Sequence, residues 1–91
     1  VSNSWASKAS LPLIGGDVRV EVGTINGIIY AVNSGALTQT YDPGTDSWAS
    51  TTPAMPTLRN FSSVEVLNGS LYVVGGIWFS NGLATLESYT P

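Results

Sequence analysis

The sequence lacks two residue types that carry much of the chemistry in proteins, since it contains no cysteine and no histidine. Without cysteine there are neither disulfides nor thiolate nucleophiles, and nothing indicates the redox compartment. Without histidine, the usual acid–base catalyst near neutral pH and the commonest transition-metal ligand are both missing. These absences exclude much of the known enzyme chemistry. We therefore expect no catalytic residues, no metal site and no cofactor.

Charged residues are also scarce. Only 10% of the residues are charged, with 3 Lys and Arg against 6 Asp and Glu, for a net charge of −3. So few basic residues cannot form a surface that neutralises phosphates, so no nucleic-acid partner is expected. No apolar run approaches the roughly 18 residues of a membrane span, and the N-terminal residues lack a signal-peptide profile, so no membrane association is expected either. The 43% hydrophobic content is enough for a folded core.

What the sequence does contain is an internal repeat. Residues 41–48 read YDPGTDSW, with Tyr and Trp seven positions apart. The same separation appears when residues 89–91 (YTP) of one copy are read into residues 1–5 (VSNSW) of another. Asn-Gly followed by an apolar run also recurs 42 positions apart, at Asn26-Gly27 and Asn68-Gly69. Periods of this size in a strand-rich sequence are typical of propeller blades.

Turn signals and apolar patterns divide the chain into two units. The first, about residues 17–51, is predicted to hold four strands, because residues 18–22 alternate and residues 28–32 are apolar on both faces, with later strands at 37–41 and around Trp48. The second, about residues 61–91, repeats this order with strands at 61–67, 71–74 and 84–89, and a long loop at 77–83. This second unit lacks a fourth strand. Residues 1–7, centred on Trp5, offer an orphan strand of the matching type.

At these residues the sequence resembles the kelch repeat. The resemblance rests on residues 71–76 (LYVVGG), residues 55–59 (MPTLR), Tyr41-Asp42-Pro43 and Trp48, and it covers essentially the whole chain. The first unit departs from the pattern, with Asn33-Ser34 where Gly-Gly is usual. The resemblance implies an all-β fold of two four-stranded antiparallel blades. Kelch blades form rings, commonly of six or seven, and the family usually binds ligands through loops on one face.

The missing strand leads to a prediction about assembly. If residues 1–7 of a neighbouring chain supply the fourth strand of the second unit, each joint is a head-to-tail contact that can close into a ring. Six blades at two per chain give a cyclic homotrimer, and rings of four or eight blades remain open alternatives. The predicted assembly residues are Val1, Trp5, Tyr89 and Pro91, with Pro91 beside Val1 of the neighbouring chain. Trp48 is expected to be buried between blades.

Four residues are candidates for binding a protein or glycan ligand. Trp78 and Phe79 lie in the long loop and have no counterpart in the first unit, so they could form an exposed contact site or fold back over their own blade. Arg59 and Asp17 each precede an Asn-Gly turn by nine positions and so occupy equivalent places. They could line a polar ligand site, or they could belong to partly solvated ion pairs that contribute little.

Two function classes follow from these observations. The first is a self-assembling scaffold or binding module without catalysis. The alternative is a carbohydrate-binding or sugar-acid-processing propeller, since the resemblance also extends to enzymes that act on sugars. The residues available for that alternative are Arg19, Glu21, Arg59, Glu65 and Trp78.

Overall fold

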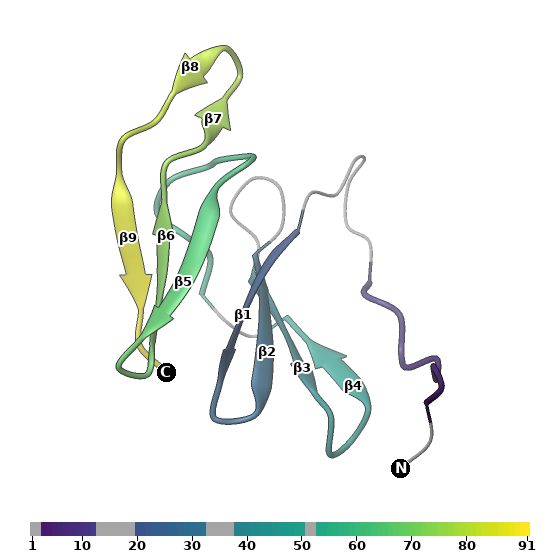
Figure 1. Ribbon diagram of the computed structural model, residues 1–91. Coiled ribbons are helices and arrows are strands. Elements are labelled where there is room, and N and C mark those ends of the chain that lie inside the picture. The colour runs from purple at the N-terminus through teal and green to yellow at the C-terminus, as the bar shows by residue number, and fades with distance from the viewer. Residues whose placement is uncertain (1–2, 13–19, 33–37, 51–52) are drawn as a thin grey trace.

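Two antiparallel β-sheets pack face to face in the computed structural model, which describes residues 3–12, 20–32, 38–50 and 53–91 (Figure 1). The first sheet contains β1 (Glu21–Ile25), β2 (Ile28–Val32), β3 (Thr38–Asp42) and β4 (Ser47–Ala49), in the order β1-β2-β3-β4. Each strand pairs with the one before it, as in the up-and-down order expected from the sequence. No helix long and apolar enough to cross a membrane occurs in these residues.

The second sheet has three strands. These are β5 (Ser63–Leu67), β6 (Ser70–Val74) and β9 (Leu86–Tyr89), in the order β5-β6-β9, and no fourth strand joins them within the described part of the chain. Between β6 and β9, the segment expected to be a loop forms a hairpin of β7 (Ile77–Trp78) and β8 (Asn81–Gly82). This hairpin stands at the opposite end of the sheet from the β5–β6 turn (Figure 1).

Backbone conformation at a few residues explains the turns. Asn26 and Gly27 have φ values of 51° and 79°, and Asn68 and Gly69 have 50° and 76°. Positive φ at both central residues is what a two-residue hairpin turn of the primed type requires, so both predicted Asn-Gly hairpins are confirmed. Gly76 is needed for a different reason, because a Cβ there would lie 2.5 Å from the Asn60 carbonyl oxygen.

Strand β5 begins later than the sequence suggests. The expected strand starts at Phe61, but Phe61 has φ of 57°, in the left-handed region that an extended strand cannot include. The backbone of Asn60 instead pairs with Ile77, with hydrogen bonds of 2.7 and 2.8 Å. Of the first unit's expected strands, Val18 and Leu37 lie outside the described residues.

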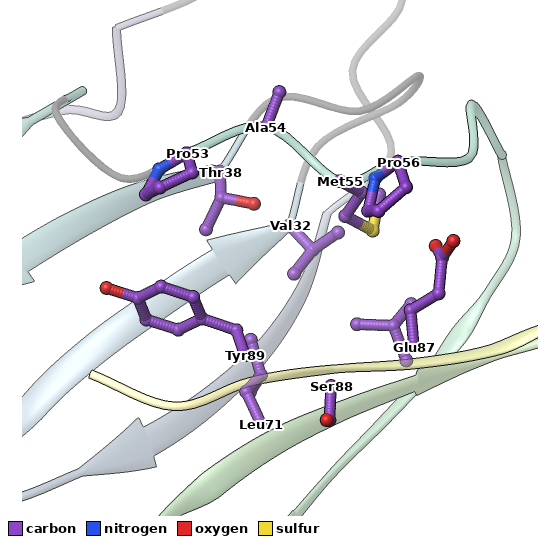
Figure 2. Close-up of a pocket in the computed structure, with 11 residues that line it drawn as sticks. Val32, Thr38, Pro53, Ala54, Met55, Pro56, Leu71, Glu87, Ser88 and Tyr89 are labelled. Carbon is purple, nitrogen blue, oxygen red and sulfur yellow. The ribbon is translucent and has the colours of Figure 1, made fainter.

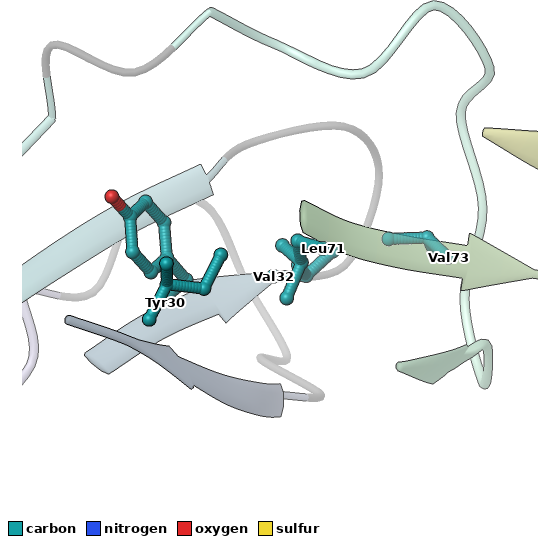
Figure 3. Close-up of a cluster of buried hydrophobic side chains, with 5 residues drawn as sticks. Tyr30, Val32, Leu71 and Val73 are labelled. Carbon is teal, nitrogen blue, oxygen red and sulfur yellow. The ribbon is translucent and has the colours of Figure 1, made fainter. Parts of the chain in front are cut away.

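The core lies between the two sheets. Ile25, Tyr30 and Val32 from the first sheet meet Leu71 and Val73 from the second, and all five are buried (Figure 3). Close approach at this joint depends on Gly23, because a Cβ there would lie 2.6 Å from Leu71 Cδ1. We call the contact between these two sheets the in-chain joint.

The N-terminal segment does not form the strand predicted for it. In this single chain, residues 3–12 contain no strand, since an isolated strand has no neighbour with which to form hydrogen bonds. The segment runs along the first sheet instead. The Ala9 amide donates to Asp46 Oδ1 at 2.9 Å, and Trp48 Nε1 donates to the Ala9 carbonyl at 2.9 Å. The Gln39 side-chain amide donates to the Pro12 carbonyl at 3.3 Å.

In the single chain Trp48 is not fully buried; its expected burial between blades concerns the face of the first sheet that the in-chain joint leaves open. It lies half-buried on β4, the outermost strand of the first sheet, with the N-terminal segment beside it. Its ring packs against that of Tyr41, with centroids 5.1 Å apart. In this chain Trp48 therefore contacts both Tyr41 on β3 and the N-terminal segment at the edge of the first sheet.

Candidate functional site

The outer edge of β9 is the first candidate site. In the first sheet, β3 is flanked by β4, with Tyr41 opposite Trp48. In the second sheet, β9 pairs with β6 on one side, and no strand among the described residues pairs with its other side. Tyr89 holds the place on β9 that Tyr41 holds on β3, because Leu71 opposes Tyr89 as Ile29 opposes Tyr41. An unpaired strand edge exposes backbone donors and acceptors that can bind a further strand.

The residues around Tyr41 show how the edge of β3 is covered when a fourth strand is present. The Tyr41 hydroxyl donates a hydrogen bond to Asp46 Oδ1. The Ala9 amide, and then this hydroxyl, hold the pKa of Asp46 below its usual value. The same hydrogen bond to Asp46 is the main cause that raises the pKa of Tyr41. At the turn before Asp46, the carboxylate of Asp42 accepts the Gly44 amide at 2.8 Å, the turn-shaping role expected for Asp42.

The face of the second sheet that points away from the core carries a group of four apolar side chains. We call it the outer face. Tyr72 is half-buried there, and the exposed fractions of Leu67, Val74 and Leu86 are 56%, 44% and 61%. Strand register places all four on one side of the sheet, since Tyr72 opposes Ser88 and Val74 opposes Leu86. Clustered exposed apolar side chains of this kind mark an association surface.

Arg59 is almost wholly buried, although it borders a cavity of about 250 Å³ that Glu21, Val32 and Ser62 also line. The residue is 1% exposed, and its guanidinium forms a 2.6 Å ion pair with Glu87. It also donates to the Gly75 carbonyl at 2.8 Å and to Thr85. The Thr57 hydroxyl, and then Arg59, hold the pKa of Glu87 below its usual value, although burial acts in the opposite direction. Arg59 therefore forms hydrogen bonds that link three segments of the chain. This burial does not agree with the place in a ligand site that the sequence suggested for Arg59.

The β7–β8 hairpin presents the aromatic pair that the sequence singled out. Phe79 is 83% exposed, and Trp78 is half-buried with its ring edge-on to Phe79 at 5.0 Å. Phe79 has φ of 56°, which is unusual for a bulky residue. Leu58, Phe61 and Ile77 are further exposed apolar residues in segments that the Asn60–Ile77 pairing links. Of the two interpretations, an exposed hairpin describes Phe79 better than a loop folded over its blade.

A cavity of about 210 Å³ opens where residues 53–56 cross the two sheets (Figure 2). Most of its lining is apolar and includes Val32, Met55 and Leu71. The polar groups beside it include the Glu87 carboxylate, which Arg59 and Thr57 already engage. This arrangement offers no pair of reactive groups.

The remaining predicted residues are distributed as follows. Val1, Asp17 and Arg19 lie outside the described residues. Trp5 is 101% exposed, and Pro91 is also exposed. Trp5 and Tyr89 are not brought together in one chain, because residues 3–12 lie beyond β4 while β9 lies at the far side of the other sheet (Figure 1). Where the structure describes the chain, no three acidic residues cluster in a way that could hold a metal ion.

Antiparallel sheets stacked face to face, each built up-and-down, are the architecture of adjacent blades in a β-propeller. The Kelch motif model matches residues 58–91. A mouse (Mus musculus) protein, Kelch-like protein 23, is 37% identical over 57 residues, which is 60% of this chain. The chain spans about a tenth of the length of that relative. Residues 58–91 therefore carry kelch-repeat sequence, which confirms the resemblance for the second unit and fits part of a β-propeller.

Proposed function

We propose that this chain is a self-assembling kelch-type propeller unit, which acts as a scaffold or binding module without catalysis. Residues 1–7 of the next copy add to the open edge of β9 in each copy. One observation carries the proposal. Tyr41 has Trp48 opposite it on β4, whereas no described residue lies opposite Tyr89 on the open side of β9, and Trp5, the repeat equivalent of Trp48, is fully exposed.

The path of the N-terminal segment supports the same proposal. Gln39 and Glu87 occupy equivalent places, opposite Ala31 and Val73. Gln39 bonds to Pro12, and Glu87 bonds to Thr57. The segment before each sheet thus crosses that sheet over the same position. Residues 53–57 come directly from β4 of the preceding sheet, so residues 3–7 stand where a preceding blade would supply its outermost strand.

Head-to-tail addition of copies can continue into an open filament or close into a ring. Each copy offers one open β9 edge and one donor segment, so the contact is heterologous and forms a ring when the rotation per copy divides a full turn. With two blades per copy, rings of four, six or eight blades hold two, three or four copies. We propose the six-bladed cyclic homotrimer, since six is a common blade number for the kelch resemblance. The interface includes Tyr89 and Pro91 of one copy with Val1 and Trp5 of the next.

Substitution of Trp5 tests the proposal. Because Trp5 is fully exposed, Trp5→Ala should leave the fold of the single chain intact while weakening assembly at least tenfold, measured by sedimentation equilibrium. Phe79→Ala is the matched control, since it removes an exposed aromatic residue away from β9 and should leave assembly unchanged. Equal assembly by wild type and Trp5→Ala would contradict the proposal.

The binding part of the proposal concerns the β7–β8 hairpin. Kelch repeats generally act as protein-binding scaffolds, and a rigid hairpin that exposes Phe79 beside Trp78 suits an apolar anchor on a protein ligand. Asp17, at the same end by the repeat pattern, is proposed to contribute polar contacts. Peptides selected from a displayed library against the wild-type chain should bind Phe79→Ala at least tenfold more weakly. If Phe79→Ala binds these peptides as tightly as wild type, the hairpin is not part of the binding site.

The carbohydrate alternative makes a different prediction. The residues available for it include Arg59, whose guanidinium is buried, and Trp78, which is half-buried. A panel of glycans, assayed for binding and turnover, should give neither if the scaffold proposal is right. Turnover of any sugar acid would favour the alternative.

A further inference from the structure

The in-chain joint supplies a template for a second joint. Residues 28–32 of β2 and 70–74 of β6 are repeat equivalents, 42 positions apart. Tyr30 and Val32, which enter the in-chain core from the first sheet, therefore correspond to Tyr72 and Val74 on the outer face of the second. The side of each sheet that faces the following blade thus carries matching apolar residues, and among the described residues a following sheet covers this side in the first sheet but not in the second.

The opposite side of the first sheet corresponds to the side of the second sheet that is already covered. Leu71, Val73 and Tyr89 meet the first sheet at the in-chain joint. Their equivalents are Ile29, Ala31 and Tyr41, which share the face of the first sheet that points away from the core. Residues 9–12 cross that face at Gln39 as residues 53–57 cross the other at Glu87. Ala31 and Tyr41 are already buried in the single chain, whereas Ile29 is half-buried.

We infer, on the basis of the assembly proposed above, that the joint between copies repeats the in-chain joint residue by residue. Tyr72 of one copy takes the place of Tyr30 and packs against Ile29 and Tyr41 of the next. Leu67, Val74 and Leu86 become buried in the same joint, where they take the places of Ile25, Val32 and Thr38. The occupant of the outer face is thus a second copy of this chain.

The strand register at the joint follows from the same equivalence. In the first sheet Thr40 opposes Ala49, and Asp42 opposes Ser47. Transferred to the open edge of β9, this register places Ser88 opposite Ala6 of the next copy, and Thr90 opposite its Ser4. Asn3 takes the place of Asp46 and can accept the hydroxyl hydrogen of Tyr89, as Asp46 accepts that of Tyr41.

One position distinguishes the two joints. Gly23 allows Leu71 to approach closely at the in-chain joint, whereas Glu65 stands at its equivalent position in β5. Glu65 is exposed in the single chain. The joint between copies is therefore wider near this inner strand, and its closest contacts lie on β6 and β9.

Disulfide trapping tests the register cleanly, because the chain has no cysteine of its own. Ser4, Ala6, Ser88 and Thr90 are all exposed, so cysteine at these positions should not disturb the fold. Two double variants are matched to the proposed register, S4C/T90C and A6C/S88C. Two others recombine the same positions out of register, S4C/S88C and A6C/T90C. Opposed residues lie within disulfide range, whereas diagonal ones are about 7–8 Å apart.

Mild oxidation should cross-link the matched variants into a ladder that stops at the ring size on a non-reducing gel, with yields at least tenfold above those of the mismatched variants. Two outcomes are separable. If unoxidised protein is oligomeric but the mismatched pairs cross-link equally well, the register is wrong while the proposed assembly stands. If the unoxidised protein is monomeric, the assembly itself fails, and the inference fails with it.

A second variant tests the packing of the faces. Tyr72→Ala should raise the dissociation constant of the assembly at least tenfold, whereas Leu58→Ala, at another exposed apolar position, should not change it. Circular dichroism of each variant as a monomer at high dilution should match wild type, because the Tyr72 side chain points away from the in-chain core. Unchanged assembly of Tyr72→Ala would overturn the inferred face.

Discussion

Tyr30 and Tyr89 pack against each other across the two sheets, with ring centroids 5.9 Å apart and planes tilted by 49°. Burial, and then the neighbouring Tyr89, raise the pKa of Tyr30. Tyr89 therefore contributes its ring to the in-chain joint while its strand edge remains open toward the outside. The same residue links the core of one chain to the proposed contact with the next.

The core between the sheets should be sensitive to the loss of Leu71. The residue is 2% exposed and packs with Val73 and residues from the other sheet. Leu71→Ala should lower the free energy of unfolding by about 2–5 kcal/mol, measured by urea denaturation at fixed chain concentration. Leu58→Ala, at a 47% exposed position, should cost less than about 1 kcal/mol. Equal losses would show that the two sheets do not pack as described.

Gly23 should not tolerate a side chain. A Cβ at this position would lie 2.6 Å from Leu71 Cδ1 and 2.9 Å from Val66 Cγ2, so Gly23→Ala forces the sheets apart. We expect it to lower the free energy of unfolding by about 1–3 kcal/mol. Gly82→Ala is the control, since a Cβ there meets no atom within 4 Å. A neutral effect of Gly23→Ala in thermal and urea unfolding would contradict this close contact.

Stability should fall in acid because of Glu87. Its folded-state pKa lies below the usual value for a glutamate, so the contribution of this carboxylate is present above the pKa of the unfolded chain. That contribution is lost as the pH falls from about this value through the folded-state pKa. Glu87→Gln should be less stable than wild type at pH 7 and should lose less stability between pH 5 and pH 2. Parallel stability curves for the two proteins would contradict this role.

Removal of Arg59 should also be costly at neutral pH. Arg59→Met leaves the Glu87 carboxylate with Thr57 but without its cation, and it removes the guanidinium bonds to Gly75 and Thr85. Loss of one partner from a buried ion pair typically costs about 3–5 kcal/mol, which urea denaturation would measure. A cost as small as that of an exposed pair, below about 1 kcal/mol, would place Arg59 at the surface.

Trp48 should contribute less than a fully buried tryptophan. Because it is half-buried on the outermost strand, Trp48→Ala should cost about 1–3 kcal/mol from the loss of the Tyr41 contact and the Ala9 hydrogen bond. Trp48→Phe keeps the ring contact but not the hydrogen bond, and should recover part of that loss. If both variants match wild type, the N-terminal segment is not held as described.

Much of the strand order could be predicted from the sequence, because the signals for it are local. The Asn26-Gly27 and Asn68-Gly69 pairs specify tight hairpins wherever they occur between apolar runs. The hairpin at 77–82 is not predicted in the same way, since its turn lies at Phe79-Ser80, ahead of the Asn81-Gly82 pair, and depends on positive φ at a phenylalanine. Its formation rests on Asn60, whose backbone pairs with Ile77 from outside the segment.

The environments of Arg59 and Trp48 could not be predicted, because both depend on contacts between residues far apart in sequence. Arg59 is buried through partners 16 to 28 positions away, Gly75, Thr85 and Glu87. Trp48 meets Ala9, which is 39 positions away. A repeat pattern identifies equivalent positions, but it does not say which of them a neighbouring segment covers.

The most direct test of the proposed assembly is native mass spectrometry of the intact 91-residue chain, alongside a variant that lacks residues 1–7. The proposal predicts a dominant species at three times the 9.5 kDa mass of the chain, and a monomer for the truncated variant, because the deletion removes Trp5 and the donated strand at every joint. A stable 9.5 kDa monomer of the intact chain, at concentrations where the chain is folded, would contradict the proposal.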